Sequence, residues 1–177
     1  KKNVFIFKSP FLFIKLLNVI KSLFSLKPLQ FGIFFSNKMK NFIIQNAENY
    51  DLIFFYHVRS SQYLPRNYSG EKIIEMGDLY SSNYNQTFEN LNIFNPLKYI
   101  YLLESFLIKK TETMIFSSFD KIILFSKSEI KKINNSFKKK IYQINISVNK
   151  IKNKYKFSKN NNKILFDENL KYLPNYL

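Results

Sequence analysis

The sequence predicts an α/β fold with a Rossmann-like parallel sheet and helices on both faces. Short apolar runs alternate with longer stretches in which apolar residues recur at helical spacing, which is typical of βαβ units. The runs are continuous rather than alternating, as expected for strands covered on both sides. A chain of 177 residues is long enough for one such domain with a sizeable core. The predicted strands are Val4–Phe7, Asp51–Tyr56, Lys72–Met76, Lys121–Phe125 and Ile141–Ile144.

The first helix is predicted over Phe11–Ser25. It follows Ser9 and Pro10, an arrangement that starts helices. Lysines interrupt the apolar stretch below the length of a membrane span. Two interpretations stay open, a helix largely buried against the sheet, which we favour, and a helix on a membrane surface. Its narrow polar stripe consists of Lys15, Asn18, Ser22 and Ser25.

The later elements continue the alternation. Leu29–Phe35 is predicted as a short strand or turn, and Asn37–Asn46 as a helix. Ser81–Asn95 is polar and rich in asparagine, and Pro96 after it opens the longest helix, over Leu97–Phe119.

Three acidic residues accompany the predicted helices of the second half. Glu104 and Glu112 are eight residues apart, so they share a helix face within about 80° and form a solvated or cross-helix pair. Ser126 is predicted to cap a short helix over Lys127–Asn135, with Glu129 in its first turns.

The ends of the sequence suggest a fragment of a longer protein. The chain begins at Lys1 rather than Met and stops soon after a new apolar run at Lys163–Phe166. We therefore expect a Rossmann-like domain over residues 1–149 and an exposed, lysine- and asparagine-rich linker over 150–162. Residues 163–177 would begin a second domain.

The net charge of +16 invites a nucleic-acid partner, but its distribution does not favour one. Only two of the 28 basic residues are arginine, the side chain best suited to bases and phosphates. Residues 41–126, which hold the polar loops, carry more acids than bases. The abundance of Lys, Asn, Ile and Phe is typical of an AT-rich genome, so the charge reflects either codon bias or a functional basic surface.

Candidate site residues follow the predicted strands, in three clusters. Because the carboxyl ends of parallel strands form one rim, we expect the clusters to lie together and to suit a polyhydroxylated or phosphorylated ligand. Each of these residues can instead have a purely structural role. In that interpretation Asp78 and Ser126 cap helices, and Arg59 pairs with an acid. Without cysteine, and with one histidine and no suitable acidic loop, no metal is expected. The candidates are His57 and Arg59, Asp78 and Ser81, and Ser126 and Glu129.

Six segments carry weak motifs in a fixed order. They are LKPLQF from Leu26, DLIF from Asp51 with Arg59 and Tyr63, KIIEMGDLYS from Lys72, the pair Glu104 and Glu112, IILFS from Ile122 with Ser128 and Glu129, and ILF from Ile164 with Tyr172, Pro174 and Asn175. Together they resemble the N-terminal domain of GT-B glycosyltransferases of family 4, especially those of capsular and exopolysaccharide synthesis. The corresponding family patterns read kPLQ, yDvv…R…Y, kvldmvDalS, E…l..yE, vvlvSe.E and ilFvGn..Y.PN.

The resemblance implies a hexosyltransferase-type enzyme of bacterial surface polysaccharide synthesis. Such an enzyme moves a sugar from a nucleotide-sugar to a glycan or lipid-linked acceptor, in the cytoplasm at the inner face of the plasma membrane. Residues 1–149 would be the acceptor-binding domain without its first strand, and 163–177 the start of the nucleotide-sugar-binding domain. The catalytic residues are expected in that second domain, so this fragment alone is expected to be inactive. No cofactor and no nucleic-acid partner are expected.

The same resemblance assigns acceptor binding to His57, Arg59, Asp78, Ser81, Ser126 and Glu129. The basic surfaces and the Phe11–Phe24 helix would fit peripheral docking on an anionic membrane. The main alternative is a non-catalytic basic protein that binds nucleic acid or an anionic membrane surface. A groove lined by lysines and stacked tyrosines would favour this alternative. A non-catalytic interaction domain is a third option, favoured by departures such as Gly77, where the family has a larger residue.

Overall fold

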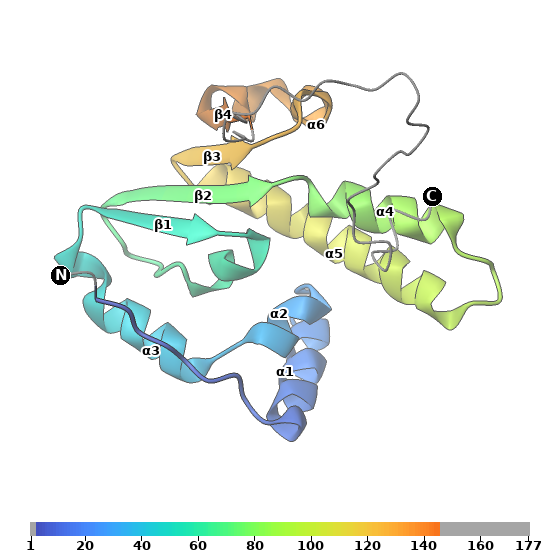
Figure 1. Cartoon of the computed structure of the whole chain (residues 1–177), viewed down its shortest axis with the longest axis horizontal. Helices are drawn as coiled ribbons and strands as arrows, with labels where there is room; N and C mark the ends of the chain where they lie inside the picture. The colour runs from blue at the N-terminus through green and yellow to red at the C-terminus, as the bar shows by residue number, and fades with distance from the viewer. Residues whose placement is uncertain (1–2, 146–177) are drawn as a thin grey trace, which may run out of the picture.

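The computed structural model describes residues 3–145, which contain a four-stranded parallel sheet (Figure 1). The strands lie side by side in the order β1-β2-β3-β4. The predicted parallel sheet is therefore confirmed, and the predicted ends of these strands are correct to within one residue. The strands are β1 (Leu52–Tyr56), β2 (Glu71–Gly77), β3 (Lys121–Leu124) and β4 (Ile141–Gln143).

Helices precede and connect the strands. The α-helices are α1 (Leu12–Phe24), α2 (Leu29–Phe34), α3 (Asn37–Asn46), α4 (Tyr80–Asn90), α5 (Pro96–Ser118) and α6 (Lys127–Lys132). Short 3-10 helices are η1 (Ala47–Asn49), η2 (Val58–Tyr63) and η3 (Asn135–Lys140). The helices predicted as α3 and α5 are confirmed, and α6 is confirmed as an element but ends at Lys132 rather than at the predicted Asn135. The Ser126 cap is also confirmed, and its hydroxyl accepts a hydrogen bond from the Glu129 N–H at 3.5 Å.

One face of the sheet forms the core. Phe55, Ile74 and Ile122 stand in register on β1, β2 and β3, are buried, and belong to one cluster with apolar side chains of α5. On the opposite face of β1, Phe54 and Tyr56 are 50% and 70% exposed, and no helix covers them in the described part of the chain (Figure 1). The prediction of helices on both faces is therefore wrong for β1. Side chains alternate along a strand, and here only one side of the apolar run is buried.

Helix α1 is confirmed as an element, but the favoured interpretation of it as largely buried is wrong. Ser22 of the polar stripe is buried, whereas Leu12 and Phe13 are exposed. The stripe faces α2, where a Cβ on Gly32 would lie 2.5 Å from the carbonyl oxygen of Asn18. Only a glycine permits such a close approach of the two helices. Because this contact places the polar stripe of α1 on α2, the apolar side of α1 points outward.

Helix α2 replaces the strand or turn predicted at Leu29–Phe35. Two backbone N–H groups of its first turn donate to the carboxylate of Glu104, at 2.7 and 3.1 Å. At its other end the Tyr63 hydroxyl donates to the carbonyl of Phe34 at 3.0 Å. A helix of six residues needs such partners because most of its backbone groups lie at an end. Both partners are distant in sequence, so local patterns do not reveal the helix.

Two further segments differ from expectation. Val4–Phe7 is not a strand. It pairs with no other strand among the described residues, and the rings of Phe5 and Phe7 contact Phe42 of α3 at 4.6 and 5.4 Å. The polar segment Ser81–Asn95 overlaps the unpredicted helix α4, which begins at Tyr80.

The remaining predictions concern the end of the chain. The linker at 150–162 and the strand at Lys163–Phe166 lie outside the described residues. Within residues 3–145, no helix combines the length and apolar character needed to cross a membrane.

Candidate functional site

A polar cleft of about 940 Å³ opens at the carboxyl edge of β2 and β3. Four of the six predicted site residues line it, namely Asp78 and Ser81 after β2, and Ser126 and Glu129 after β3. One side of α5 completes the wall. Ligands of parallel α/β sheets bind at this edge, and pockets for small ligands measure roughly 300–1,000 Å³.

Ser81 is held in the cleft by a buried carboxylate of α5. Its hydroxyl donates to Glu112 Oε2 at 2.5 Å, and its backbone N–H donates to Oε1 at 3.1 Å. Burial raises the pKa of Glu112 above its usual range, while the bonds from Ser81 oppose that rise. The pair fixes the first turn of α4 against α5.

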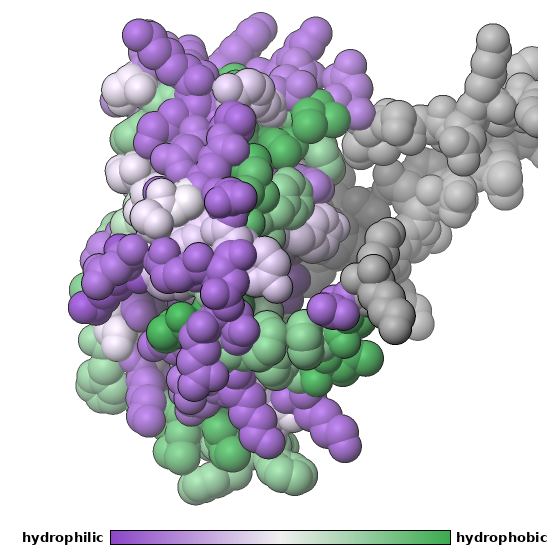
Figure 2. Space-filling view, turned by 90° about the vertical axis from the view of Figure 1, so that its left-hand side faces the viewer, coloured by the Kyte–Doolittle hydropathy of each residue, from purple (hydrophilic) through white to green (hydrophobic). Residues whose placement is uncertain are grey.

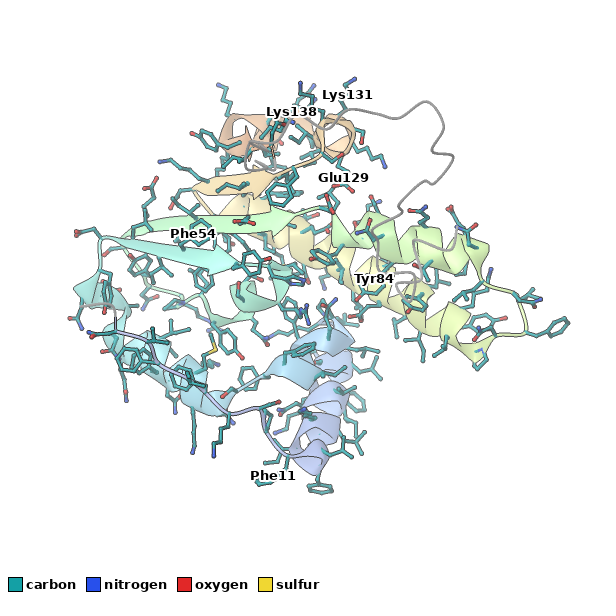
Figure 3. All side chains as sticks on the ribbon, viewed as in Figure 1. Phe11, Phe54, Tyr84, Glu129, Lys131 and Lys138 are labelled. Atoms are coloured by element: carbon teal, nitrogen blue, oxygen red, sulfur yellow. The ribbon has the colours of Figure 1, made fainter. Side chains whose placement is uncertain are left out.

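Glu129 joins the two loops that border the cleft. Its Oε2 accepts a hydrogen bond from the backbone N–H of Leu79 at 2.8 Å, so the start of α6 is tied to the start of α4. Burial raises the pKa of Glu129, and the negative charge of Asp78 raises it further. Figure 3 shows Glu129 close to the point where β2 leads into α4.

Asp78 is exposed at the cleft, and its carboxylate has no hydrogen bond or ion pair to any residue in 3–145. The alternative in which it caps α4 is therefore wrong, since the residue at the cap position is Leu79 and α4 has no side-chain cap. For Ser126 the capping alternative is confirmed. Its hydroxyl also lies 2.8 Å from that of Ser128, which leaves both hydroxyls at the cleft.

His57 and Arg59 do not line the cleft but form a separate cluster at the end of β1. The Nδ1 of His57 accepts hydrogen bonds from the backbone N–H and the Nε of Arg59, each at 3.2 Å. The Arg59 guanidinium also lies over the Phe34 ring, 4.3 Å from its centroid. It makes no ion pair with an acid anywhere in the described part of the chain, so that alternative is wrong.

The backbone and charge state of His57 are both unusual. Its φ of 71° and ψ of 146° fall in a region that non-glycine residues rarely adopt. Burial, and secondarily the charge of Arg59, lowers its pKa to about 4, so the ring is neutral at pH 7. The ring contacts that of Tyr80 at 4.3 Å. Tyr80 contacts the cluster, and the next residue, Ser81, lines the cleft. The cluster and the cleft therefore lie on two sides of the first turn of α4.

The sequence did not identify the contribution of α4 and α5 to the cleft. Glu112 was expected to form a solvated or cross-helix pair with Glu104, but both are buried and each binds a different helix. The spacing that places Glu104 and Glu112 on one helix face was the only local sequence pattern that pointed to these two residues. Further polar groups at the cleft come from Asn85, Gln86 and Lys109.

The cleft offers hydroxyls, amides, carboxylates and two ammonium groups, a set that can bind a polyhydroxylated molecule through many hydrogen bonds. Within residues 3–145, no group of three or more His, Cys, Asp and Glu side chains is arranged to hold a metal ion. No known protein family, curated protein or solved structure matches this chain. Its function is therefore inferred from its residues and their geometry.

Proposed function

We propose that this chain is the acceptor-binding part of a glycosyltransferase, which moves a sugar from a nucleotide-sugar to a glycan or lipid-linked glycan in surface polysaccharide synthesis. The cleft receives the acceptor. The nucleotide-sugar binds a part of the enzyme outside the described residues, and the described residues alone do not catalyse transfer. The enzyme works in the cytoplasm, at the inner face of the plasma membrane.

The observation that carries this proposal is the convergence of two motif segments on one cleft. Lys72–Ser81 and Ile122–Glu129 resemble the family's segments around kvldmvDalS and vvlvSe.E. Asp78, Ser81, Ser126 and Glu129, the polar residues of those segments, all line the cleft at the carboxyl edge. Four weak motif positions that meet at one ligand-sized cavity support a shared role more strongly than each does alone.

The charge of the cleft favours an uncharged sugar there. Among the described residues, the lining includes two lysines, Lys109 and Lys132, and four carboxylates, namely Asp78, Glu89, Glu112 and Glu129. An excess of carboxylates disfavours a phosphate, while carboxylate oxygens accept strong hydrogen bonds from sugar hydroxyls. The Arg59 guanidinium, which has no acidic partner in residues 3–145, then contacts a charged part of a longer acceptor outside the cleft.

Asp78 provides the test. The 177-residue chain is titrated with a panel of neutral hexose di- and trisaccharides, with binding followed by saturation-transfer NMR. Asp78→Asn should weaken binding about ten-fold, because a hydrogen bond to a charged group contributes roughly 1.5–3 kcal/mol. Glu48→Gln is the matched control, because Glu48 is exposed and does not line the cleft. Equal affinity of Asp78→Asn and the parent chain, or no binding of any sugar, contradicts the proposal.

One observation favours the alternative of an anionic polymer partner. Five exposed lysines, Lys127, Lys131, Lys132, Lys138 and Lys139, gather on α6 and η3. Figure 3 shows Lys131 and Lys138 at the outer edge of the molecule. Among residues 3–145, no tyrosine and only one of these lysines line the cleft. Retention of the chain by single-stranded DNA at physiological salt, lost in Lys138→Glu, would favour this alternative.

A further inference from the structure

The exposed side of α1 is a continuous apolar surface. At 3.6 residues per turn, six large apolar side chains fall within an arc of about 120°. Each of them is at least 43% exposed, and Leu12 and Phe24 reach 83% and 85%. Together these six residues form what we call the α1 face: Leu12, Phe13, Leu16, Ile20, Leu23 and Phe24.

The α1 face cannot turn inward in this fold. The opposite side of the helix is already packed on α2, with Ser22 buried and Gly32 against the backbone of Asn18 and Val19. Glu104 and Tyr63 hold the two ends of α2 from other parts of the fold. A soluble surface helix normally presents the reverse arrangement, with its polar side toward water. The face is therefore built to contact something outside the described residues.

The charge around the α1 face identifies its partner. The first acidic residue of the chain is Glu48, so no carboxylate lies in the segment that contains α1, α2 and α3. That segment has six described lysines, five of them exposed: Lys8, Lys21, Lys27, Lys38 and Lys40. Figure 2 shows apolar side chains at the lower end of the molecule, the end where Figure 1 places α1, with hydrophilic side chains beside them.

We propose that the α1 face inserts into the headgroup region of an anionic lipid bilayer, with α1 parallel to the membrane plane. The Phe and Leu side chains enter the boundary of the acyl chains, and Lys21 and Lys27 contact lipid phosphates. A two-fold dimer through this face is disfavoured, because symmetry would bring the same lysines of both copies together without a carboxylate. The inference stands independently of sugar transfer, since it uses neither the cleft nor its residues.

The absence of tryptophan from the chain gives a clean test. Phe13→Trp places the sole tryptophan on the α1 face, and Tyr142→Trp places it on β4, at the other end of the molecule (Figure 1). The full 177-residue chain is mixed with vesicles of phosphatidylcholine containing about one part in three phosphatidylglycerol. The emission of Phe13→Trp should shift to the blue and that of Tyr142→Trp should not. An equal shift in both variants, or none in either, overturns the proposal.

Vesicle sedimentation separates the apolar and ionic contributions. Phe13→Glu should abolish sedimentation with these vesicles, whereas Phe94→Glu, on an exposed residue between α4 and α5, should leave it unchanged. Lys21→Ala should weaken the partition constant about five-fold, and vesicles of phosphatidylcholine alone should bind more weakly still. Equal binding of Phe13→Glu and the parent chain overturns the proposal. So does a Phe13→Trp emission already blue-shifted without vesicles, since the face would then be covered within the protein or by a second copy.

Discussion

Two polar regions share the carboxyl edge of the sheet, and they differ in how their charges are satisfied. In the cleft, carboxylates accept hydrogen bonds from backbone N–H and hydroxyl groups, as Glu112 does from Ser81 and Glu129 from Leu79. In the cluster at the end of β1, the neutral ring of His57 accepts a hydrogen bond from Arg59, and no acid among residues 3–145 pairs with the guanidinium. A rim predicted as one site is thus divided into an acidic and a cationic surface.

The start of α4 causes this division. Tyr80 contacts the His57 ring, and the next residue, Ser81, bonds to Glu112 in the cleft. Consecutive residues on a helix point about 100° apart, so a single helical turn directs one side chain to each region. Residues that share an edge of a sheet therefore do not necessarily form one site.

The largest effect is expected at the carboxylate that anchors the cleft. Glu112→Ala should lower the free energy of unfolding by about 2 kcal/mol, because it leaves the buried hydroxyl and N–H of Ser81 without an acceptor. Urea unfolding of the 177-residue chain measures this loss. Glu89→Ala, an exposed change in α4 at the same cleft, should stay within about 0.5 kcal/mol of the parent chain. Similar losses in the two variants would show that the Glu112 bonds do not fix the cleft.

A smaller effect is expected for the charge in the His57 cluster. As the sole histidine, His57 can be titrated by NMR, with a midpoint near pH 4 expected in place of 6.5. Arg59→Leu should raise the pKa of His57 by less than half of this difference, because burial is the larger cause. Arg66→Leu, which removes the other arginine, should leave the midpoint unchanged.

The same titration fixes how His57 affects stability. The folded protein binds fewer protons than the unfolded chain between pH 6.5 and about 4, so this part of the free energy of unfolding falls as the pH falls through that window. A midpoint near 6.5 in the folded parent chain would contradict both the burial and the charge of the cluster.

The smallest effect concerns the backbone of His57. Both His57→Gly and His57→Ala remove the ring, but only glycine adopts a φ of 71° without strain. The glycine variant should therefore exceed the alanine variant by about 1 kcal/mol in free energy of unfolding. Urea midpoints of the two variants give the comparison, and an alanine variant that is at least as stable would show that the backbone at this position is not strained.

Elements with a strong local pattern could be predicted from the sequence. The four paired strands are compact apolar runs, and α5 and α6 begin at Asn95-Pro96 and Ser126, where the chain itself supplies the start signal. Their parallel order followed from the alternation of strands and helices. Four of the six predicted site residues meet in the cleft for the same reason, since they follow adjacent strands.

What could not be predicted depends on distant partners. Helix α2 requires Glu104, which is 75 residues from Leu29. Helix α4 looks like a loop because its inner residues, Ser81 and Thr87, are polar and satisfied by Glu112 and by the helix itself. The orientation of α1 depends on where α2 lies, because periodicity defines an apolar side but not whether another element covers it.

The attachment of α2 has a consequence for local opening. Its two ends are held by single side chains, Glu104 and Tyr63, and α1 packs on it through the close approach at Gly32. Hydrogen bonds are short and directional, so the bonds at both ends of α2 break together once α2 moves away from Glu104 and Tyr63 by a fraction of a bond length. The α1–α2 pair should therefore open as one cooperative unit below the free energy of global unfolding, with the amides of Leu29 and Gln30 exchanging hydrogen at a common rate. The α1–α2 pair, on which the proposed membrane contact lies, would then be a detachable unit, and its protection from hydrogen exchange would report whether it is docked on the sheet domain.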